Sequence, residues 1–312
     1  MRVPTLALLG WAAMFALGCR APEPTPDAGQ APPGFTEYGA TPCEPVGDIQ
    51  FICDLISPED LAILPGSEWV IASGAQEGGR LHLVSVRDKT TTVLFPTPLQ
   101  DERHDTTTYP TCPGPLAPEE QEIFRGHGLY LRPGEGAVHT LYVVHHGTRE
   151  SVEVFEVDAQ STPPGLTWVG CVPALSTLSL NSVVALPEGG LAATSGPTGD
   201  VWEWQTGTGW RRVPGSEGTA PNGLEISKDG RWMYIAGWSE EKLTRISRGQ
   251  TPVQKDVVAL GFRPDNLRMS LDGSTIFAAG HADKDGNSIS EPRAPLTETS
   301  NVATIDPQTL AV

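Results

Sequence analysis

The sequence predicts an all-β fold of the β-propeller class, and two features of the chain lead to this prediction. A short pattern of two strands around a turn occurs five times, at a period near that of a propeller blade. The clearest copy runs from Pro221 to Gly237 and turns at Asp229-Gly230. In addition, 34 glycines and 29 prolines among 312 residues indicate many turns. We therefore expect short antiparallel strands arranged as blades around a central channel.

The five copies define five predicted blades. Their innermost strands are expected at 61–64, 129–131, 182–186, 224–227 and from residue 267 onward. A further strand at 48–53 precedes the first copy, and in closed propellers such a strand often completes the last blade. The long polar segment 97–126 is a candidate lid over the channel mouth, because loops of that size are usually functional or disordered.

The end of the chain departs from the pattern of a closed ring. The fifth predicted blade lacks its outer strand, and the chain stops at Val312. We therefore expect a six-bladed-type β-propeller that is truncated at its C-terminus, with about five blades and an incomplete last blade. Such a ring leaves strand edges and apolar faces without neighbours, which favours self-association.

The residues that open the copies are candidates for a functional site. The first strand of a propeller blade is the innermost, so side chains at its entry point into the central channel. In register, these positions hold Glu59 and Asp60, His127, Asn181, Asn222, and Asp265 and Asn266. Taken singly, each could be only a polar residue at a turn or strand entry. Together, their carboxylate and amide oxygens suit Ca²⁺, which takes 6–8 oxygen ligands.

The start of the chain has the features of an export signal. Residues 1–19 have a positive start, an apolar stretch at 6–17, and small residues before Cys19. The apolar stretch is too short to span a bilayer core of about 30 Å. Cys19 resembles the lipidated cysteine of bacterial lipoproteins, and ordinary cleavage with secretion stays open. The Pro- and Ala-rich residues 20–40 would then form a linker. The propeller domain would follow at 41–312, anchored to the bacterial outer membrane, periplasmic or secreted.

Charge and missing motifs exclude several classes of protein. The formal net charge of -17 argues against nucleic acid and anionic lipid as partners. There is no His-Glu-x-x-His, Cys-x-x-Cys or Gly-x-Ser-x-Gly sequence, so common zinc-protease, redox and serine-hydrolase sites have no support. Four cysteines after Cys19 allow three pairings, of which we favour Cys43–Cys53 with Cys112–Cys171.

Several of these motifs resemble the paraoxonase/arylesterase family. The resemblance covers about residues 53–281, in order and with similar spacing. The same propeller superfamily includes gluconolactonases and strictosidine-synthase-like proteins, and the resemblance implies a six-bladed, Ca²⁺-dependent hydrolase of lactones or aryl esters. The motifs that carry it are Glu59-Asp60-Leu61, Gly126-His127-Gly128, 142–147 (Tyr-Val-Val-His-His-Gly), 151–155 (Ser-Val-Glu-Val-Phe), Leu180-Asn181, Pro221-Asn222-Gly223 and Pro264-Asp265-Asn266.

The resemblance also implies roles for single residues. The family's general-base histidine falls on His127, its partner histidine on His146, and a further histidine near the active site on His281. Asp60 matches a ligand of a second, structural calcium, but Ser182 stands where that site has another Asp. The family's ligands for the catalytic calcium fall on Glu59, Asn181, Asn222, Asp265 and Asn266.

Three functional hypotheses follow from these residues. The first is a Ca²⁺-dependent lactonase or arylesterase in which the metal polarises the carbonyl of a small ester or lactone and His127 is the base. The second is a non-catalytic propeller that keeps the metal for stability and binds a partner, which would need the oxygen ligands but not His127. The third, carbon–carbon bond formation of the strictosidine-synthase kind, has no support in the sequence. His145 competes with His146 for the partner role.

Overall fold

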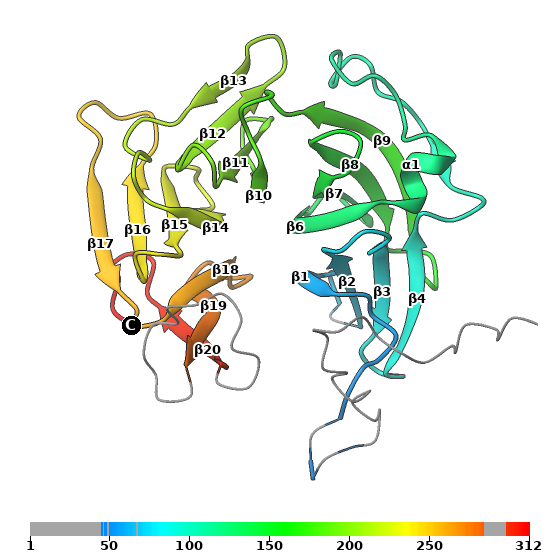
Figure 1. The fold of residues 1–312 in the computed structure, drawn as a ribbon, viewed down its shortest axis with the longest axis horizontal. Coiled ribbons are helices and arrows are strands. Elements are labelled where there is room, and N and C mark those ends of the chain that lie inside the picture. Colours follow the sequence, from blue (N-terminus) through cyan, green and yellow to red (C-terminus); the bar gives the residue numbers. More distant parts are fainter. Residues whose placement is uncertain (1–44, 46, 49, 67, 284–297) are drawn as a thin grey trace, which may run out of the picture. The chain divides into compact units, whose positions relative to one another are not determined.

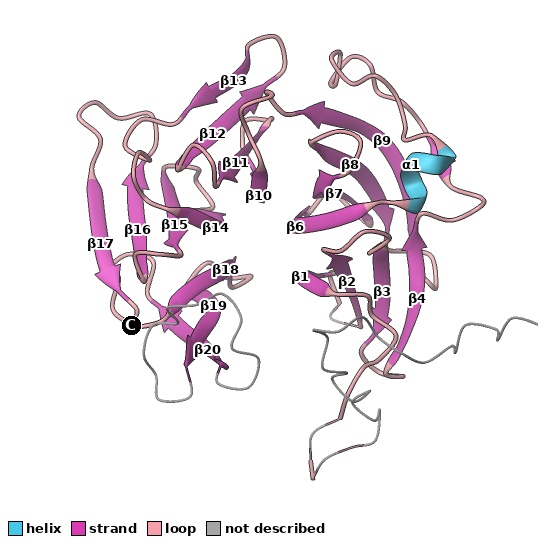
Figure 2. Cartoon of the chain, in the orientation of Figure 1, coloured by secondary structure: helices cyan, strands magenta, loops and turns pink. Residues whose placement is uncertain are grey.

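The computed structural model describes residues 45–312, except 46, 49, 67 and 284–297. These residues form five β-sheets arranged as propeller blades around a central channel, which confirms the predicted fold class (Figure 1). Strands make up almost all of the regular structure, and α1 (Pro118–Glu122) is one short helix beside them (Figure 2). The fifth blade has three strands among the described residues.

Each blade is built from successive antiparallel strands of which β1, β6, β10, β14 and β18 are innermost, and in blade two the short β5 adds in parallel to the outer strand β9 (Figure 1). The first two blades contain β1 (Pro58–Ile63), β2 (Trp69–Gly74), β3 (Leu81–Ser85) and β4 (Thr90–Phe95), then β5 (Asp101–Glu102), β6 (Arg125–Arg132), β7 (Val138–His146), β8 (Ser151–Asp158) and β9 (Gly165–Pro173). The other three contain β10 (Leu180–Ala185), β11 (Leu191–Ser195), β12 (Asp200–Gln205) and β13 (Gly209–Arg212), then β14 (Pro221–Ile226), β15 (Trp232–Gly237), β16 (Lys242–Ser247) and β17 (Lys255–Ala259), and finally β18 (Arg263–Met269), β19 (Ile276–Asp283) and β20 (Glu298–Ile305).

The core lies between the faces of successive blades. One cluster of buried apolar residues joins blades one, two and three, a second joins blades three and four, and a third joins blades four and five. Between blades one and two, Phe95 packs edge-on against Phe124 and Phe155, with ring centroids 5.0 Å apart in each pair. Where a blade has a neighbour on each side, both faces of its inner and second strands are therefore covered. Strands that are buried on both faces are expected to be rich in β-branched and small apolar residues.

The inner strand of every blade carries the same irregularity. The pairing register of β1, β6, β10, β14 and β18 with the following strand shifts after the first or second residue. Each shift encloses the residues that the sequence predicted as ligands or base. Bulges of this kind re-aim side chains near functional sites, so the repeated bulge gives a local reason for the ring of polar side chains.

Two glycines let neighbouring inner strands approach at the bulges. A Cβ atom added to Gly128 would lie 2.4 Å from the carbonyl oxygen of Asn181. A Cβ atom on Gly223 would lie 2.2 Å from the carbonyl oxygen of Asp265. Both distances are far below van der Waals contact, so a side chain at either position would push two blades apart at the channel.

Two expectations about the segments outside the blades are wrong. Residues 50–53 form no strand; the carbonyl of Cys53 instead accepts a hydrogen bond of 3.2 Å from Thr91 Oγ1 at the outer strand of blade one. Segment 97–126 is not a lid but packs on blade two through β5, α1 and the Cys112–Cys171 disulfide. That disulfide confirms one of the favoured pairs. Cys53 is also disulfide-bonded, and its predicted partner Cys43 lies outside the described residues.

The outward faces of blades one and five are exposed. Leu61 on β1 is 52% exposed, whereas Leu129, at the equivalent position of blade two, is fully buried. Phe277 on β19 is 42% exposed, whereas Tyr234, its equivalent in blade four, is 2% exposed. Among the described strands, none of the blades is joined to another by backbone pairing, so it is the exposure of Leu61 and Phe277 that distinguishes this junction from the others. The ring is therefore open at this place, as predicted.

The predicted signal peptide (1–19), the lipidation residue Cys19 and the whole predicted linker (20–40) lie outside the described residues. Export and lipid anchoring therefore stay predictions. Within the described part of the chain, no helix has the length and apolar character needed to cross a membrane.

Candidate metal and catalytic site

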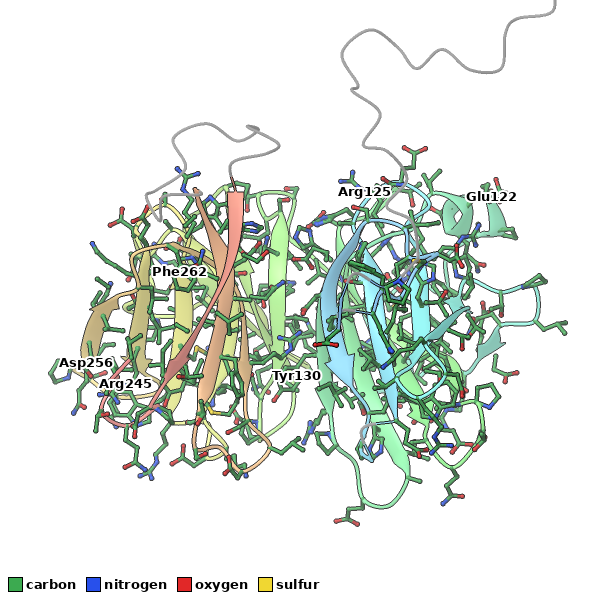
Figure 3. All side chains as sticks on the ribbon, turned by 90° about the horizontal axis from the view of Figure 1, so that it is seen from below. Glu122, Arg125, Tyr130, Arg245, Asp256 and Phe262 are labelled. Atoms are coloured by element: carbon green, nitrogen blue, oxygen red, sulfur yellow. A yellow bond between two sulfur atoms is a disulfide. The ribbon has the colours of Figure 1, made fainter. Side chains whose placement is uncertain are left out.

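The predicted ligands lie together because the blades place equivalent residues around the channel. In Figure 3, Arg125 at the start of β6 lies near one end of the strands, and Tyr130, later in β6, lies toward the other end. The bulged residues follow directly after such strand starts. They therefore belong to one end of the channel, where side chains of all five blades meet.

Blade five and blade one are connected through Asn266 and Glu59. Asn266 Nδ2 donates to Glu59 Oε1 over 3.0 Å, and also to the Glu59 carbonyl oxygen over 3.3 Å. The same Glu59 oxygen lies 3.6 Å from His127 Nε2 of blade two. His127 Nε2 in turn lies 3.1 Å from Asn181 Nδ2 of blade three. One continuous series of polar contacts thus links four blades.

Asp265 extends this arrangement to blade four. Its carboxylate accepts a hydrogen bond from the Asn222 side chain, and its Oδ2 lies 3.3 Å from His281 Nε2. The His281 ring also packs edge-on against Trp238, with centroids 5.5 Å apart. Burial raises the pKa of Asp265 above its ordinary range. His281 therefore lies beside the ring of oxygen groups, as the sequence predicted, on the side of blades four and five.

Four oxygens of this ring have no hydrogen-bond partner. They are Glu59 Oε2, Asn181 Oδ1, Asn222 Oδ1 and Asn266 Oδ1. In the part of the chain that the structure describes, every other buried side-chain atom without a partner is a nitrogen. A buried oxygen without a partner is costly. All of the unpartnered buried oxygens thus belong to the residues predicted to bind calcium.

The chemistry of the ring fits a hard cation. Burial, followed by the neighbouring Asp60 carboxylate, raises the pKa of Glu59 to about 8. A buried carboxylate favours its protonated form when no cation lies nearby to balance its negative charge. A bound divalent cation would balance that charge. Among the described residues no three or more His, Cys, Asp and Glu side chains are grouped as a metal site. The amide oxygens therefore have to complete the set, as Ca²⁺ allows.

The two predicted histidines form a pair that ends on a carboxylate. His127 Nδ1 lies 2.9 Å from His146 Nε2, and His146 Nδ1 lies 2.8 Å from Glu150 Oε2. Burial, and then the nearby His146 and Arg125, lower the pKa of His127 to about 4. His127 is therefore neutral at pH 7 in the metal-free protein, and a neutral imidazole is the form that can take a proton.

The competing histidine, His145, lies away from this pair. Its ring stacks on Phe124 with a centroid distance of 4.7 Å and is fully buried. Neither of its ring nitrogens has a hydrogen-bond partner. His146, rather than His145, is thus the histidine in contact with His127.

Asp60 is engaged in a different contact from the other predicted ligands. Its carboxylate forms an ion pair with Arg268, and Asp60 Oδ2 also accepts the Leu129 amide hydrogen over 2.7 Å. Arg268 also donates to the Leu129 carbonyl over 2.7 Å and to the Leu61 carbonyl over 3.3 Å. Ser182, at the position of the missing carboxylate, accepts a hydrogen bond from the Leu224 amide. A guanidinium cation thus already compensates the buried Asp60 charge.

Sequence reasoning missed Glu150 and Arg268. A signal for Arg268 is present, because it and Glu225 occupy the same register position in neighbouring copies, and the other copies have uncharged residues there. The structure pairs Arg268 with Asp60, however, and not with Glu225. Glu150 gives a weaker signal, a carboxylate four residues after His146 across a hairpin turn. Only the fold brings it back to the histidine.

Comparisons with known proteins show similarity at the level of structure. No family model matches the sequence, and no curated protein matches it. Similar solved structures include hydrazine synthase from Kuenenia stuttgartiensis, with 14% identity over 81% of this chain and 84% of that chain and a TM-score of 0.48. The periplasmic gluconolactonase from Pseudomonas aeruginosa has 14% identity over 80% and 70% of the two chains, with a TM-score of 0.45. A putative 6-phosphogluconolactonase from Bacteroides uniformis has 14% identity over 79% and 70%, with a TM-score of 0.44.

Proposed function

We propose that this protein is a calcium-dependent hydrolase of lactones or aryl esters, related to the paraoxonase/arylesterase family. The observation that carries the proposal is the set of four unpartnered buried oxygens, all on predicted calcium ligands, beside a neutral histidine. A structural role for these polar groups would leave them paired with one another. The similar structures named above carry no part of this argument, since their likeness is weak.

Calcium would be held by Glu59, Asn181, Asn222, Asp265 and Asn266, and when bound it would polarise the carbonyl of the ester or lactone. His127 then takes a proton from the attacking water at Nε2, the ring nitrogen that faces Glu59 and Asn181. His146 holds the His127 ring in place through the contact between Nε2 and Nδ1. His281 lies beside the proposed ligand Asp265 and would contact the substrate or its leaving group.

We expect one calcium ion rather than two. Asp60 belongs to the set that a second ion would need, but its carboxylate is already paired with Arg268. A second ion would have to compete with the Arg268 guanidinium, and Ser182 adds no charge to attract it. The amount of tightly bound calcium, measured by atomic emission after gel filtration, should therefore be one per chain.

The decisive experiment is hydrolysis of a panel of lactones and aryl esters, with and without EDTA. Hydrolysis that EDTA abolishes and calcium restores would support the proposal. Calcium binding without hydrolysis of any substrate would favour the alternative function, a metal-stabilised propeller that serves as a binding module. Hydrolysis that is indifferent to EDTA, in a protein that purifies without calcium, would refute the metal assignment.

Export of the protein, with lipidation at Cys19, is a separate proposal. Radiolabelled palmitate should be incorporated into the full chain in a bacterial host, and Cys19→Ser should abolish the label. Label that persists in the variant would refute lipidation at this residue.

A further inference from the structure

Glu150 is a carboxylate that the proposed chemistry does not use, yet it touches the histidine pair. It lies just before β8, and each of its two oxygens accepts one hydrogen bond. Oε1 accepts from the Leu180 amide over 2.6 Å, and Oε2 lies 2.8 Å from His146 Nδ1. Leu180 opens β10 and directly precedes Asn181, so Glu150 joins the histidine pair to the strand that carries a predicted calcium ligand.

The hydrogen-bond pattern dictates where the protons lie. An ionised carboxylate only accepts hydrogen bonds, so His146 Nδ1 must carry a hydrogen and donate to Glu150. When the His146 imidazole carries a single N–H, that hydrogen is on Nδ1 and Nε2 is an acceptor. The His127 Nδ1 atom that lies 2.9 Å from it must then be the donor. It follows that His127 Nε2 carries the lone pair of this ring, and Asn181 Nδ2 lies 3.1 Å from it.

The contact between His127 and Asn181 leads independently to the same position for the His127 hydrogen. Asn181 Nδ2 lies 3.1 Å from His127 Nε2, and an amide nitrogen can only donate. His127 Nε2 must therefore accept, which again places the His127 hydrogen on Nδ1. The same orientation of the Asn181 side chain leaves its Oδ1 unpartnered and free for a cation.

We propose that Glu150 is a positioning residue that fixes the tautomers of His146 and His127, so that the lone pair of His127 Nε2 lies in the channel beside the predicted calcium ligands. Its catalytic consequence rests on the proposed hydrolase function. In that reaction an O–H bond of water breaks and its proton bonds to His127 Nε2, while the hydroxide oxygen bonds to the carbonyl carbon. The acyl C–O bond then breaks, and the leaving oxygen takes the proton from His127. The wrong tautomer would place a hydrogen where the proton has to arrive.

Glu150→Gln tests the inference sharply. Glutamine has one oxygen and one NH₂ group in place of two oxygens, while the Leu180 amide still requires an acceptor. The side-chain oxygen should stay on Leu180, so the NH₂ group would face His146 Nδ1. His146 would then carry its hydrogen on Nε2 and donate to His127 Nδ1. The His127 hydrogen would move to Nε2, and the Asn181 amide would have to turn so that its unpartnered Oδ1 accepts it.

The readout is the tautomer of each histidine, measured by long-range ¹H–¹⁵N NMR on metal-free protein labelled at its seven histidines. Single His127→Gln and His146→Gln variants assign the signals. We expect the Nδ1–H form for both residues in the wild type and the Nε2–H form for both in Glu150→Gln. A wild-type His127 in the Nε2–H form, or identical tautomers in the two proteins, would overturn the inference. If the variant does not fold, a wild-type His127 in the Nε2–H form would still overturn the inference.

Kinetics provide a second, separable readout. Glu150→Gln should lower kcat by about 10²–10⁴-fold with little change in KM, the range for loss of a correctly oriented base. Glu156→Gln, which removes an outer ion pair with Arg103 on the same strand, should leave kcat unchanged. In a His146→Gln background, Glu150→Gln should have no further effect, because the connection is already broken.

The outcomes distinguish this inference from the proposed function. Reversed tautomers in a protein that hydrolyses nothing would support the positioning role and refute the hydrolase. Active wild-type protein together with full activity and unchanged tautomers in Glu150→Gln would refute the positioning role and leave the hydrolase intact.

Discussion

The affinity for calcium should depend steeply on pH, because one of the predicted ligands is protonated at neutral pH. Burial and the adjacent Asp60 raise the pKa of Glu59 to about 8. A carboxylate must lose its proton before it can bind a metal. Calcium binding near pH 7 should therefore release a proton from Glu59 into solution.

The size of the effect follows from that pKa. When a ligand with a pKa of about 8 has to be deprotonated, the apparent affinity falls about tenfold at pH 7 and about a hundredfold at pH 6, relative to the plateau above pH 9. Each of these factors of ten corresponds to about 1.4 kcal/mol. The pKa of Asp265 is also raised by burial, which should make the dependence steeper at lower pH.

Isothermal titration calorimetry gives both quantities. Titrations of metal-free protein with CaCl₂ at pH 6, 7 and 8 give the affinities, and buffers with different ionisation enthalpies give the number of protons released. We expect about one proton per calcium between pH 6 and 7. At 100 times the dissociation constant, calcium should add about 2.7 kcal/mol to the free energy of unfolding. For a domain of this size, that raises Tm by about 5 °C.

The metal-free protein should respond to pH with the opposite sign. The pKa of Glu59 in the folded state, about 8, is raised above its ordinary value of 4.5, so the folded state binds more protons than the unfolded state. This carboxyl group therefore contributes stability below pH 4.5 that is lost as the pH rises through about 8. Glu59→Gln should remove this loss of stability and should also abolish the calcium response.

Two results would refute this reasoning. One is a calcium affinity that is constant from pH 6 to 8, because it would mean that no ligand has to lose a proton. The other is a Glu59→Gln variant that binds calcium like the wild type, because it would remove Glu59 from the ligands. Glu156→Gln, an outer-surface substitution of the same kind, serves as the control for a general effect of charge removal.

Three further predictions test other parts of the structure. His127→Gln should lower the hydrolysis rate by about 10²–10⁴-fold in steady-state assays while calorimetry finds nearly unchanged calcium affinity; unchanged turnover would remove its role as base. Arg268→Gln should lower the free energy of unfolding by about 3–5 kcal/mol in urea titrations, because it leaves the buried Asp60 charge unpaired, and a loss that persists in an Asp60→Asn background would contradict this. Leu61→Ser should cost less than about 1 kcal/mol, whereas the equivalent Leu129→Ser should cost about 2–5 kcal/mol; equal costs would mean that another segment covers Leu61.

The ring of ligands could be predicted from the sequence because it is encoded by repetition. The copies share one register, and each bulge falls at the same place in its strand. A residue such as Asn181 or Asn222 is uninformative alone but becomes informative when four equivalents carry similar groups. The exposed faces at Leu61 and Phe277 also followed from counting strands in the copies.

Contacts outside the repeat could not be predicted in this way. Segment 97–126 has no counterpart in the other blades, and its packing on blade two depends on tertiary contacts such as the Cys112–Cys171 disulfide. Residues 50–53 have the composition of a strand but form none in the structure. Glu150 and Arg268 could not be predicted for a different reason. They are charges that act on the site from neighbouring blades, and only their positions in space reveal their partners.

The open side of the ring and the candidate metal site meet at the same place. Blade five contacts blade one through side chains, with Asn266 on Glu59 and Arg268 on Asp60, rather than through strand pairing. The channel end there holds three carboxylates, and Arg268 is the guanidinium that pairs with one of them. Calcium bound to Glu59 and Asp265 would neutralise the others and connect the two blades directly. Stability and catalysis would then depend on the same ion, so chelation should weaken the contact between blades one and five at the place where substrate binds.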